Sequence, residues 1–149
     1  MKKLLLLSLL FLSIHFAQAQ TATTPRAPAD RNHEIILIEL TDSPEATWRR
    51  LAQVLMQRGY GIEHSDKDLL TLATYPLEGF GFPIRVVGLL TDKAIMLRMY
   101  QSRGSEPGKF LTERIRRRGG DNVEWLELEA IARDMGGRIS YAVSTNRVQ

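Results

Sequence analysis

The closest approach to a metal-binding pattern in this sequence is a histidine followed by two aspartates at alternate positions, His64, Asp66 and Asp68. In an extended strand, alternate side chains point to one face, so His64 and Asp66 would share a side. Imidazole and carboxylate groups together bind divalent ions. Asp66-Lys67-Asp68 is also typical of a tight turn, in which aspartate side chains bond to the nearby backbone. We interpret the segment as the turn of a hairpin and predict no metal site.

Nucleophilic catalysis needs a nucleophile, a base and a group that orients the base. Beyond the first 19 residues the only imidazole bases are His33 and His64, and no Gly-x-Ser-x-Gly elbow is present. The glycine-rich segment 79–82 precedes Pro83 and an apolar run, not a helix N-terminus that could bind phosphate. The sequence therefore supports no catalytic residue and no cofactor site, and it leaves enzyme activity open.

Four arginines between positions 114 and 118 form the most marked charge cluster. Such a cluster can bind anionic lipid, lipopolysaccharide phosphates or an acidic patch on a protein. A short run of charge is more often a solvated connection between two elements. The two phenylalanines of the glycine-rich segment are a second candidate for contact with a partner. The candidate partner-binding residues are Phe80, Phe82, Arg114, Arg116, Arg117 and Arg118.

Two helices are expected to frame these residues. The first is predicted over residues 43–58, where Pro44 takes the first helical position and needs no hydrogen-bond donor. Trp48, Leu51 and Leu55 then recur at helical spacing and form one apolar stripe.

The second helix is predicted to begin after Asp121-Asn122, either of which can cap it, and to end at Gly136-Gly137. Trp125 and Leu128 lie on its apolar stripe. The two tryptophans, one on each helix, are the expected anchors of the helices on a sheet.

Between and beside the helices, short β-rich runs predict strands. The predicted strands cover residues 33–40, 60–65, 69–75, 84–90 and 94–100. Segments 76–83 and 102–109 are predicted loops because they are rich in glycine and proline. Residues 110–118 stay ambiguous between a short helical turn and a charged connection, and residues 139–143 between a last strand and an ordered tail.

The order of these elements predicts an α+β fold, β-α-β-β-β-β-α. We expect a single antiparallel sheet of four to six strands with two helices packed on one face. A chain of 149 residues has the usual length of one domain, and we place this domain at residues 33–149.

Several of these features resemble the helix-grip domains of the BamC type, whose namesake belongs to the bacterial machinery that assembles outer-membrane β-barrels. The shared features are, in chain order, Trp48, Gly59-Tyr60, Ile62, Asp66 and Leu72-Ala73-Thr74. The sequence pattern covers about residues 43–74, and the shared order of elements covers about residues 33–136. BamC-like proteins are lipoproteins with two such domains, whereas this chain has one. The resemblance implies a binding module located in the cell envelope.

The first 19 residues are typical of a cleavable signal peptide. Two lysines precede an apolar stretch, residues 4–16, and Ala-Gln-Ala at 17–19 fits the cleavage pattern of signal peptidase. The apolar stretch of about 13 residues is shorter than the ~20 that a spanning helix needs. We therefore predict an exported protein with no transmembrane span after cleavage. Residues 20–32, rich in threonine, alanine and proline, are interpreted as a flexible leader.

Composition narrows the function further. Removal of residues 1–19 lowers the lysine and arginine count from 20 to 18 against 17 acidic residues, a net charge of about +1, which argues against nucleic acid as a partner. The chain has no cysteine, so it forms no disulfide and carries no lipid on a lipobox cysteine. We expect a periplasmic or secreted protein without a lipid anchor.

The leading hypothesis is an exported, non-catalytic envelope module that binds a protein partner or an amphiphile. The binding surface would be a sheet face, a sheet edge or a groove between helix and sheet. The alternative is a small secreted enzyme or enzyme inhibitor with its site in the loops 76–83 and 102–109.

Overall fold

The computed structural model describes residues 30–39, 42–91, 93–106, 109–118 and 122–144, with the backbone alone for residues 104–106 and 109–111. The predicted signal peptide, most of the predicted leader and the last five residues lie outside this described part. Its elements are, in chain order, β1 (Ile35–Glu39), α1 (Pro44–Gln57), β2 (Ile62–Asp66), β3 (Thr71–Thr74), β4 (Ile84–Leu90), β5 (Ala94–Glu106), β6 (Lys109–Arg114), α2 (Val123–Met135) and β7 (Arg138–Ala142). None of the described helices is long and apolar enough to cross a membrane.

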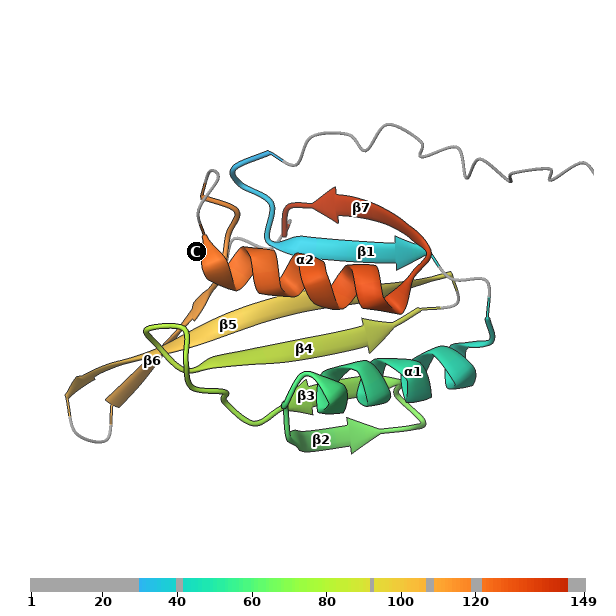
Figure 1. The fold of residues 1–149 in the computed structure, drawn as a ribbon, viewed down its shortest axis with the longest axis horizontal. Coiled ribbons are helices and arrows are strands. Elements are labelled where there is room, and N and C mark those ends of the chain that lie inside the picture. Colours follow the sequence, from blue (N-terminus) through green and yellow to red (C-terminus); the bar gives the residue numbers. More distant parts are fainter. Residues whose placement is uncertain (1–29, 40–41, 92, 107–108, 119–121, 145–149) are drawn as a thin grey trace, which may run out of the picture.

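The described residues form the expected α+β architecture, one antiparallel sheet with two helices (Figure 1). The sheet has seven strands, so the prediction of four to six strands is too low. The strand order is β2-β3-β4-β5-β1-β7, and β6 also pairs with β5.

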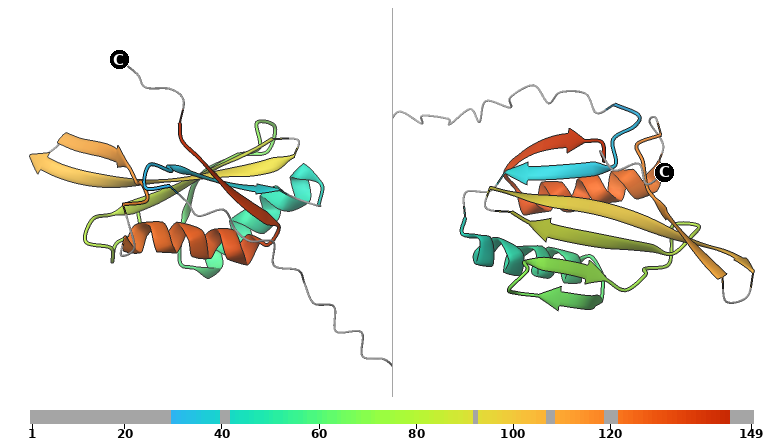
Figure 2. Two further views of the ribbon diagram at one scale, coloured as in Figure 1. Left: turned by 90° about the horizontal axis from the view of Figure 1, so that it is seen from above. Right: turned by 180° about the vertical axis from the view of Figure 1, so that it is seen from behind.

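β5 is long enough to hold two partners along the same edge. Its first part pairs with β1, from Glu39 opposite Ala94 to Ile36 opposite Leu97. Its second part pairs with β6, beginning with Tyr100 opposite Arg114. The β5–β6 hairpin therefore projects beyond the rest of the sheet (Figures 1 and 2).

The prediction of a loop over residues 102–109 is wrong at the positions that the structure describes. Residues 102–106 and 109 belong to β5 and β6, not to a loop, and residues 110–114 continue β6 without a helical turn. The polar and glycine-containing residues pair backbone to backbone across the hairpin, and this pairing overrides their weak strand propensity. The alternative hypothesis places an enzyme or inhibitor site in the loops 76–83 and 102–109. The described part of the second segment is strand, so this site would lack its second loop. Residues 138–142 form a strand, β7, which pairs antiparallel with β1.

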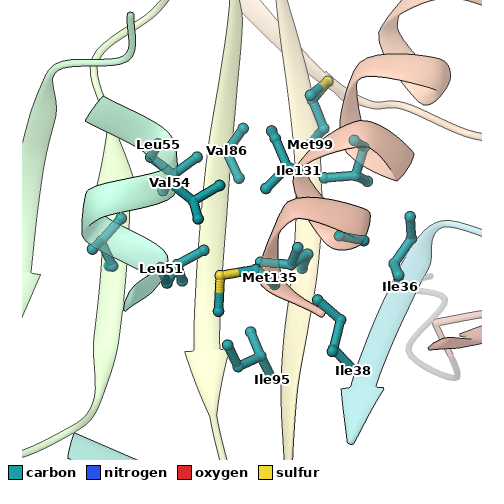
Figure 3. Packing of buried hydrophobic residues seen from close by; sticks show 14 of the residues in the cluster. Ile36, Ile38, Leu51, Val54, Leu55, Val86, Ile95, Met99, Ile131 and Met135 are labelled. Carbon is teal, nitrogen blue, oxygen red and sulfur yellow. The ribbon is translucent and has the colours of Figure 1, made fainter. Parts of the chain in front are cut away.

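Both helices lie on the same face of the sheet (Figure 2). Side chains of α1 and α2 meet those of the central strands there and form a continuous core (Figure 3). Its members include Ile36, Ile38, Leu51, Leu55, Val86, Ile95, Met99, Leu128, Ile131 and Met135.

The ends of both helices are formed by the residues that the sequence indicates. The side chain of Ser43 accepts a hydrogen bond from the backbone N–H of Ala46, and Pro44 begins α1. The side chain of Asn122 accepts one from the N–H of Trp125 at the start of α2. These side chains satisfy donors that the first helical turn leaves without partners.

Two glycines, Gly136 and Gly137, reverse the chain from α2 into β7. Both have positive φ, +70° and +86°. The two positions differ in their surroundings. A side chain at 137 would overlap the carbonyl oxygen of Glu39 in β1, whereas the nearest atom to a Cβ at 136 would be Nη2 of Arg50 at 3.6 Å. The backbone of the turn therefore lies directly against β1 at Gly137.

The two helices are also joined by Arg58, which follows α1. Its guanidinium donates two hydrogen bonds to the carboxylate of Glu127, at 2.9 and 2.6 Å, and one to Asp134 at 2.7 Å. Both carboxylates belong to α2, and they raise the pKa of Arg58 above its ordinary value. The bidentate pairing fixes the distance between the end of α1 and the middle of α2.

Tyr60 lies in the core directly after this bridge and is only 2% exposed. Burial raises the pKa of the Tyr60 phenol, and the negative charge of Glu127 raises it further. The hydroxyl therefore keeps its proton in the folded protein under conditions in which the unfolded chain would lose it.

We expect this shift to make the protein less stable in alkali. The folded pKa of Tyr60 lies above the unfolded value of about 10, so its contribution is complete below pH ~10 and is lost as the pH rises further. Tyr60→Phe removes the hydroxyl and should make the loss of unfolding free energy above pH ~10 shallower. Urea melts between neutral pH and strong alkali measure this. Tyr75→Phe, at a position 55% exposed, is the control and should follow the wild type. Equal slopes for Tyr60→Phe and the wild type would contradict the prediction.

Candidate functional site

The loop 76–83 is fastened to the base of the β5–β6 hairpin. The N–H of Ser102 donates to the carbonyl oxygen of Pro83 at 2.9 Å. Leu77 and Ile84 exchange two backbone hydrogen bonds across the loop, at 2.7 and 3.0 Å. These bonds hold the glycine-rich segment in a fixed place beside β5.

The two phenylalanines of this loop have different surroundings. Phe80 is partly buried and packs against the hydrophobic core. Phe82 is 43% exposed, and the guanidinium of Arg103 lies over its ring, 4.9 Å from the centroid. Phe80 therefore anchors the loop, and Phe82 is the phenylalanine available for contact with a partner.

Arg103 is held between this ring and a carboxylate. Glu113 of β6 lies opposite Gln101 of β5 and accepts a hydrogen bond from its amide at 3.0 Å. The same carboxylate forms ion pairs with Arg103 at 3.6 Å and with Arg118 at 2.9 Å. A continuous chain of contacts thus joins Phe82 to Arg118.

We call Phe82, Arg103, Glu113 and Arg118 the hairpin-base surface. All four side chains stay substantially exposed, between 42% and 61%. Two cations share one carboxylate, so the surface has a net positive charge. The guanidinium groups of Arg103 and Arg118 can therefore donate hydrogen bonds to a further anion. An exposed aromatic ring beside the cations adds an apolar contact.

The remaining arginines of the predicted cluster serve a different contact. Arg114 and Arg116 both pair with Glu34, at 3.4 and 2.8 Å, and Glu34 is only 6% exposed. Glu34 precedes β1, so the two arginines hold the end of β6 against the start of β1 at the edge of β5. The N–H of Arg117 donates to the carbonyl oxygen of His33 at 3.0 Å and extends this junction. The buried carboxylate of Glu34 therefore pairs with both guanidinium groups and offsets one of their two charges.

A polar network beside the junction fixes α2 on β7. The indole of Trp125 and the hydroxyl of Tyr141 both donate to one oxygen of Glu129, at 3.0 and 3.1 Å. The ring of His33 stacks on Tyr141, with centroids 5.7 Å apart. These groups form no arrangement of nucleophile, base and orienting group. The contacts of these side chains join α2 to β7, and we assign them a structural role.

The turn after β2 uses the predicted aspartate for its backbone. Oδ1 of Asp66 accepts hydrogen bonds from the N–H groups of Asp68 and Leu69, both at 2.9 Å. His64 contacts the hydroxyl of Thr71 at 3.5 Å. Within the described ranges, no group of three histidine, cysteine, aspartate or glutamate side chains is placed to hold a metal ion.

The sequence predicts Phe82 and Arg118 as separate candidates, and the structure brings them to one surface through Arg103 and Glu113. Sequence reasoning misses these two connecting residues because it assigns Arg103 to a loop. It also misses Glu34, whose one signal is an acidic residue placed directly before a buried isoleucine run.

The fold and this surface define a two-layer α+β domain with an exposed cationic and aromatic surface at one end. Neither a protein-family model nor a curated protein matches the sequence.

Proposed function

We propose that this protein is an exported, non-catalytic module of the cell envelope that binds an anionic amphiphile through the hairpin-base surface. The observation that carries the proposal is the position of Arg103, stacked on the exposed ring of Phe82 and sharing Glu113 with Arg118. An anionic headgroup would pair with the two guanidinium groups, and the adjacent apolar chain would contact the ring.

Several features support an envelope location. The first 19 residues have the architecture of a signal peptide, which favours export. The resemblance to BamC-like helix-grip domains points to the same compartment, and two helices on one face of an antiparallel sheet are consistent with that resemblance. The sheet here carries β6 before α2 and β7 after it, in addition to the strands of the predicted order.

The experiment is co-sedimentation with vesicles of phosphatidylglycerol and phosphatidylcholine. The protein should begin at residue 20, which retains every described residue and removes the apolar segment that would itself bind lipid. We expect sedimentation with the anionic vesicles at low salt and little with pure phosphatidylcholine. The double variant Phe82→Ser/Arg103→Gln should weaken the association about tenfold, because it removes the ring and a charge worth ~1 kcal/mol at an anionic surface.

The matched control is Arg49→Gln/Met56→Ser on α1, which also removes one exposed arginine and one exposed apolar side chain. It should bind like the unchanged protein. Binding that is absent at low salt, or equally strong in both double variants, would contradict the proposed function.

A further inference from the structure

The face of the sheet opposite the helices is covered by no element of the described chain (Figure 2). Successive side chains of a strand alternate between the two faces, so the residues between the core positions of β1, β4 and β5 lie on this open face. We define the open face by the side chains of Leu37, Val87, Leu89, Met96 and Arg98.

An apolar row crosses the middle of the open face. Leu37 lies opposite Met96, and Met96 lies opposite Leu89, so the row runs over β1, β5 and β4. Leu89 is 38% exposed, and the other two are partly buried. Three adjacent strands span about 10 Å, which is the width of one α-helix with its side chains.

Arg98 stands beside this row without a counter-charge. It follows Met96 by two residues on β5 and lies opposite Val87 of β4. Its Nε is buried and has no hydrogen-bond acceptor, and no ion pair of Arg98 is present among the described residues. Arg85, on the same face, pairs with Glu63 at 2.6 Å. Arg98 is thus a cation on an apolar surface, where pairing with an acid gains more than it would in water.

We propose that the open face is a docking surface for an amphipathic helix of a partner protein, whose apolar stripe covers Leu37, Leu89 and Met96 and carries one carboxylate that pairs with Arg98. The bound helix would form a third layer on the side of the sheet opposite α1 and α2. The carboxylate fixes the position of the helix along β5, and the apolar row supplies the buried area.

The charges around the row favour this occupant over the others. A second copy docked face to face would bring two Arg98 side chains towards each other without an acid between them. Glu39 at one end of the face pairs with Arg138, and Glu63 at the other end pairs with Arg85, so a partner needs to supply a single negative charge and not an extended anionic surface. A helix with one acid satisfies Arg98 and leaves these pairs intact.

This surface is separate from the hairpin-base surface. Arg103 lies five residues beyond Arg98 on β5, an odd separation, so its side chain belongs to the other face. Substitutions on the open face therefore leave Phe82, Arg103 and Arg118 unchanged, and each proposal can fail alone.

The test uses labelled amphipathic peptides of about 18 residues, long enough for several helical turns, and measures binding by fluorescence anisotropy. The peptides are identical except at one position in the apolar stripe, which is glutamate, glutamine or lysine. We expect the glutamate peptide to bind about tenfold more tightly than the glutamine peptide, and the lysine peptide to bind most weakly. Arg98→Glu should reverse this order, and the charge reversal Arg49→Glu on α1 should leave it unchanged.

Arg98→Gln provides a milder variant if the charge reversal impairs folding, and it should make the glutamate and glutamine peptides bind equally. The proposal is overturned if no peptide binds, or if the order of affinities is the same for Arg98→Glu and the wild type. It is also overturned if light scattering shows a dimer that Leu89→Asp dissociates, because a second copy would then be the occupant.

Discussion

Gly137→Ala should lower the free energy of unfolding by about 3–4 kcal/mol. The backbone of Gly137 has φ +86°, a conformation that costs a residue with a side chain ~1 kcal/mol or more. The added methyl group would overlap the carbonyl oxygen of Glu39 and approach Cγ2 of Ile38 to 3.2 Å. β1 cannot retreat, because β5 and β7 hold it on both edges, so the overlap adds about 2–3 kcal/mol of strain.

Gly136→Ala separates these two causes. Gly136 also has positive φ, but a Cβ there meets no atom closer than 3.6 Å. This variant should cost about 1–2 kcal/mol, the conformational part alone, because φ +70° with ψ −173° is a conformation that almost only glycine adopts. Urea melts of both variants at neutral pH measure the difference. If the two substitutions prove equally costly, the close approach of the turn to β1 does not exist in solution.

Trp125→Ala should cost about 3–5 kcal/mol, the usual range for truncation of a buried aromatic side chain. Trp125 is 2% exposed in the core, and its indole N–H donates to Glu129 at 3.0 Å. The substitution leaves a cavity under the start of α2 and removes a hydrogen-bond donor to the carboxylate of Glu129. The ring of Tyr141, 6.2 Å away, also loses its neighbour.

Trp48→Ala is the natural comparison, because the sequence predicts the same anchoring role and the same cost for both tryptophans. In the structure Trp48 is only partly buried at the margin of the core, and its N–H lies 3.4 Å from the carbonyl oxygen of Thr71. We therefore expect a smaller loss, about 1–2 kcal/mol, since less apolar area returns to water. Denaturant melts that give equal losses for the two variants would contradict this ranking.

The two helices could be predicted because their signals are local. A capping side chain, a proline in the first turn and apolar residues at helical spacing indicate α1 from neighbouring residues alone, and the structure confirms it within one residue at each end. The pattern could not show that Trp125 is buried and Trp48 only partly so. The stripe gives the direction of a side chain, whereas burial depends on what the sheet places opposite it.

The β5–β6 hairpin could not be predicted for the opposite reason. Ser102, Arg103 and Gly104 have low strand propensity, and their strand conformation depends on pairing with β6. The same dependence hides the hairpin-base surface. Phe82 and Arg118 are recognisable as exposed candidates, but the carboxylate of Glu113 reaches Arg103 and Arg118 only after the hairpin has formed.

The position of β1 has a consequence for the order in which the chain can fold. β1 is the first element, yet its two neighbours in the sheet are β5 and β7, which come from the middle and the end of the described chain. Pairing between segments so far apart closes long loops, a slow step in folding. During synthesis, β1 therefore emerges long before either of these partner strands. Closure of this half of the sheet must wait until β7 is available, so β1 keeps at least one unpaired edge until nearly the whole chain is free to fold.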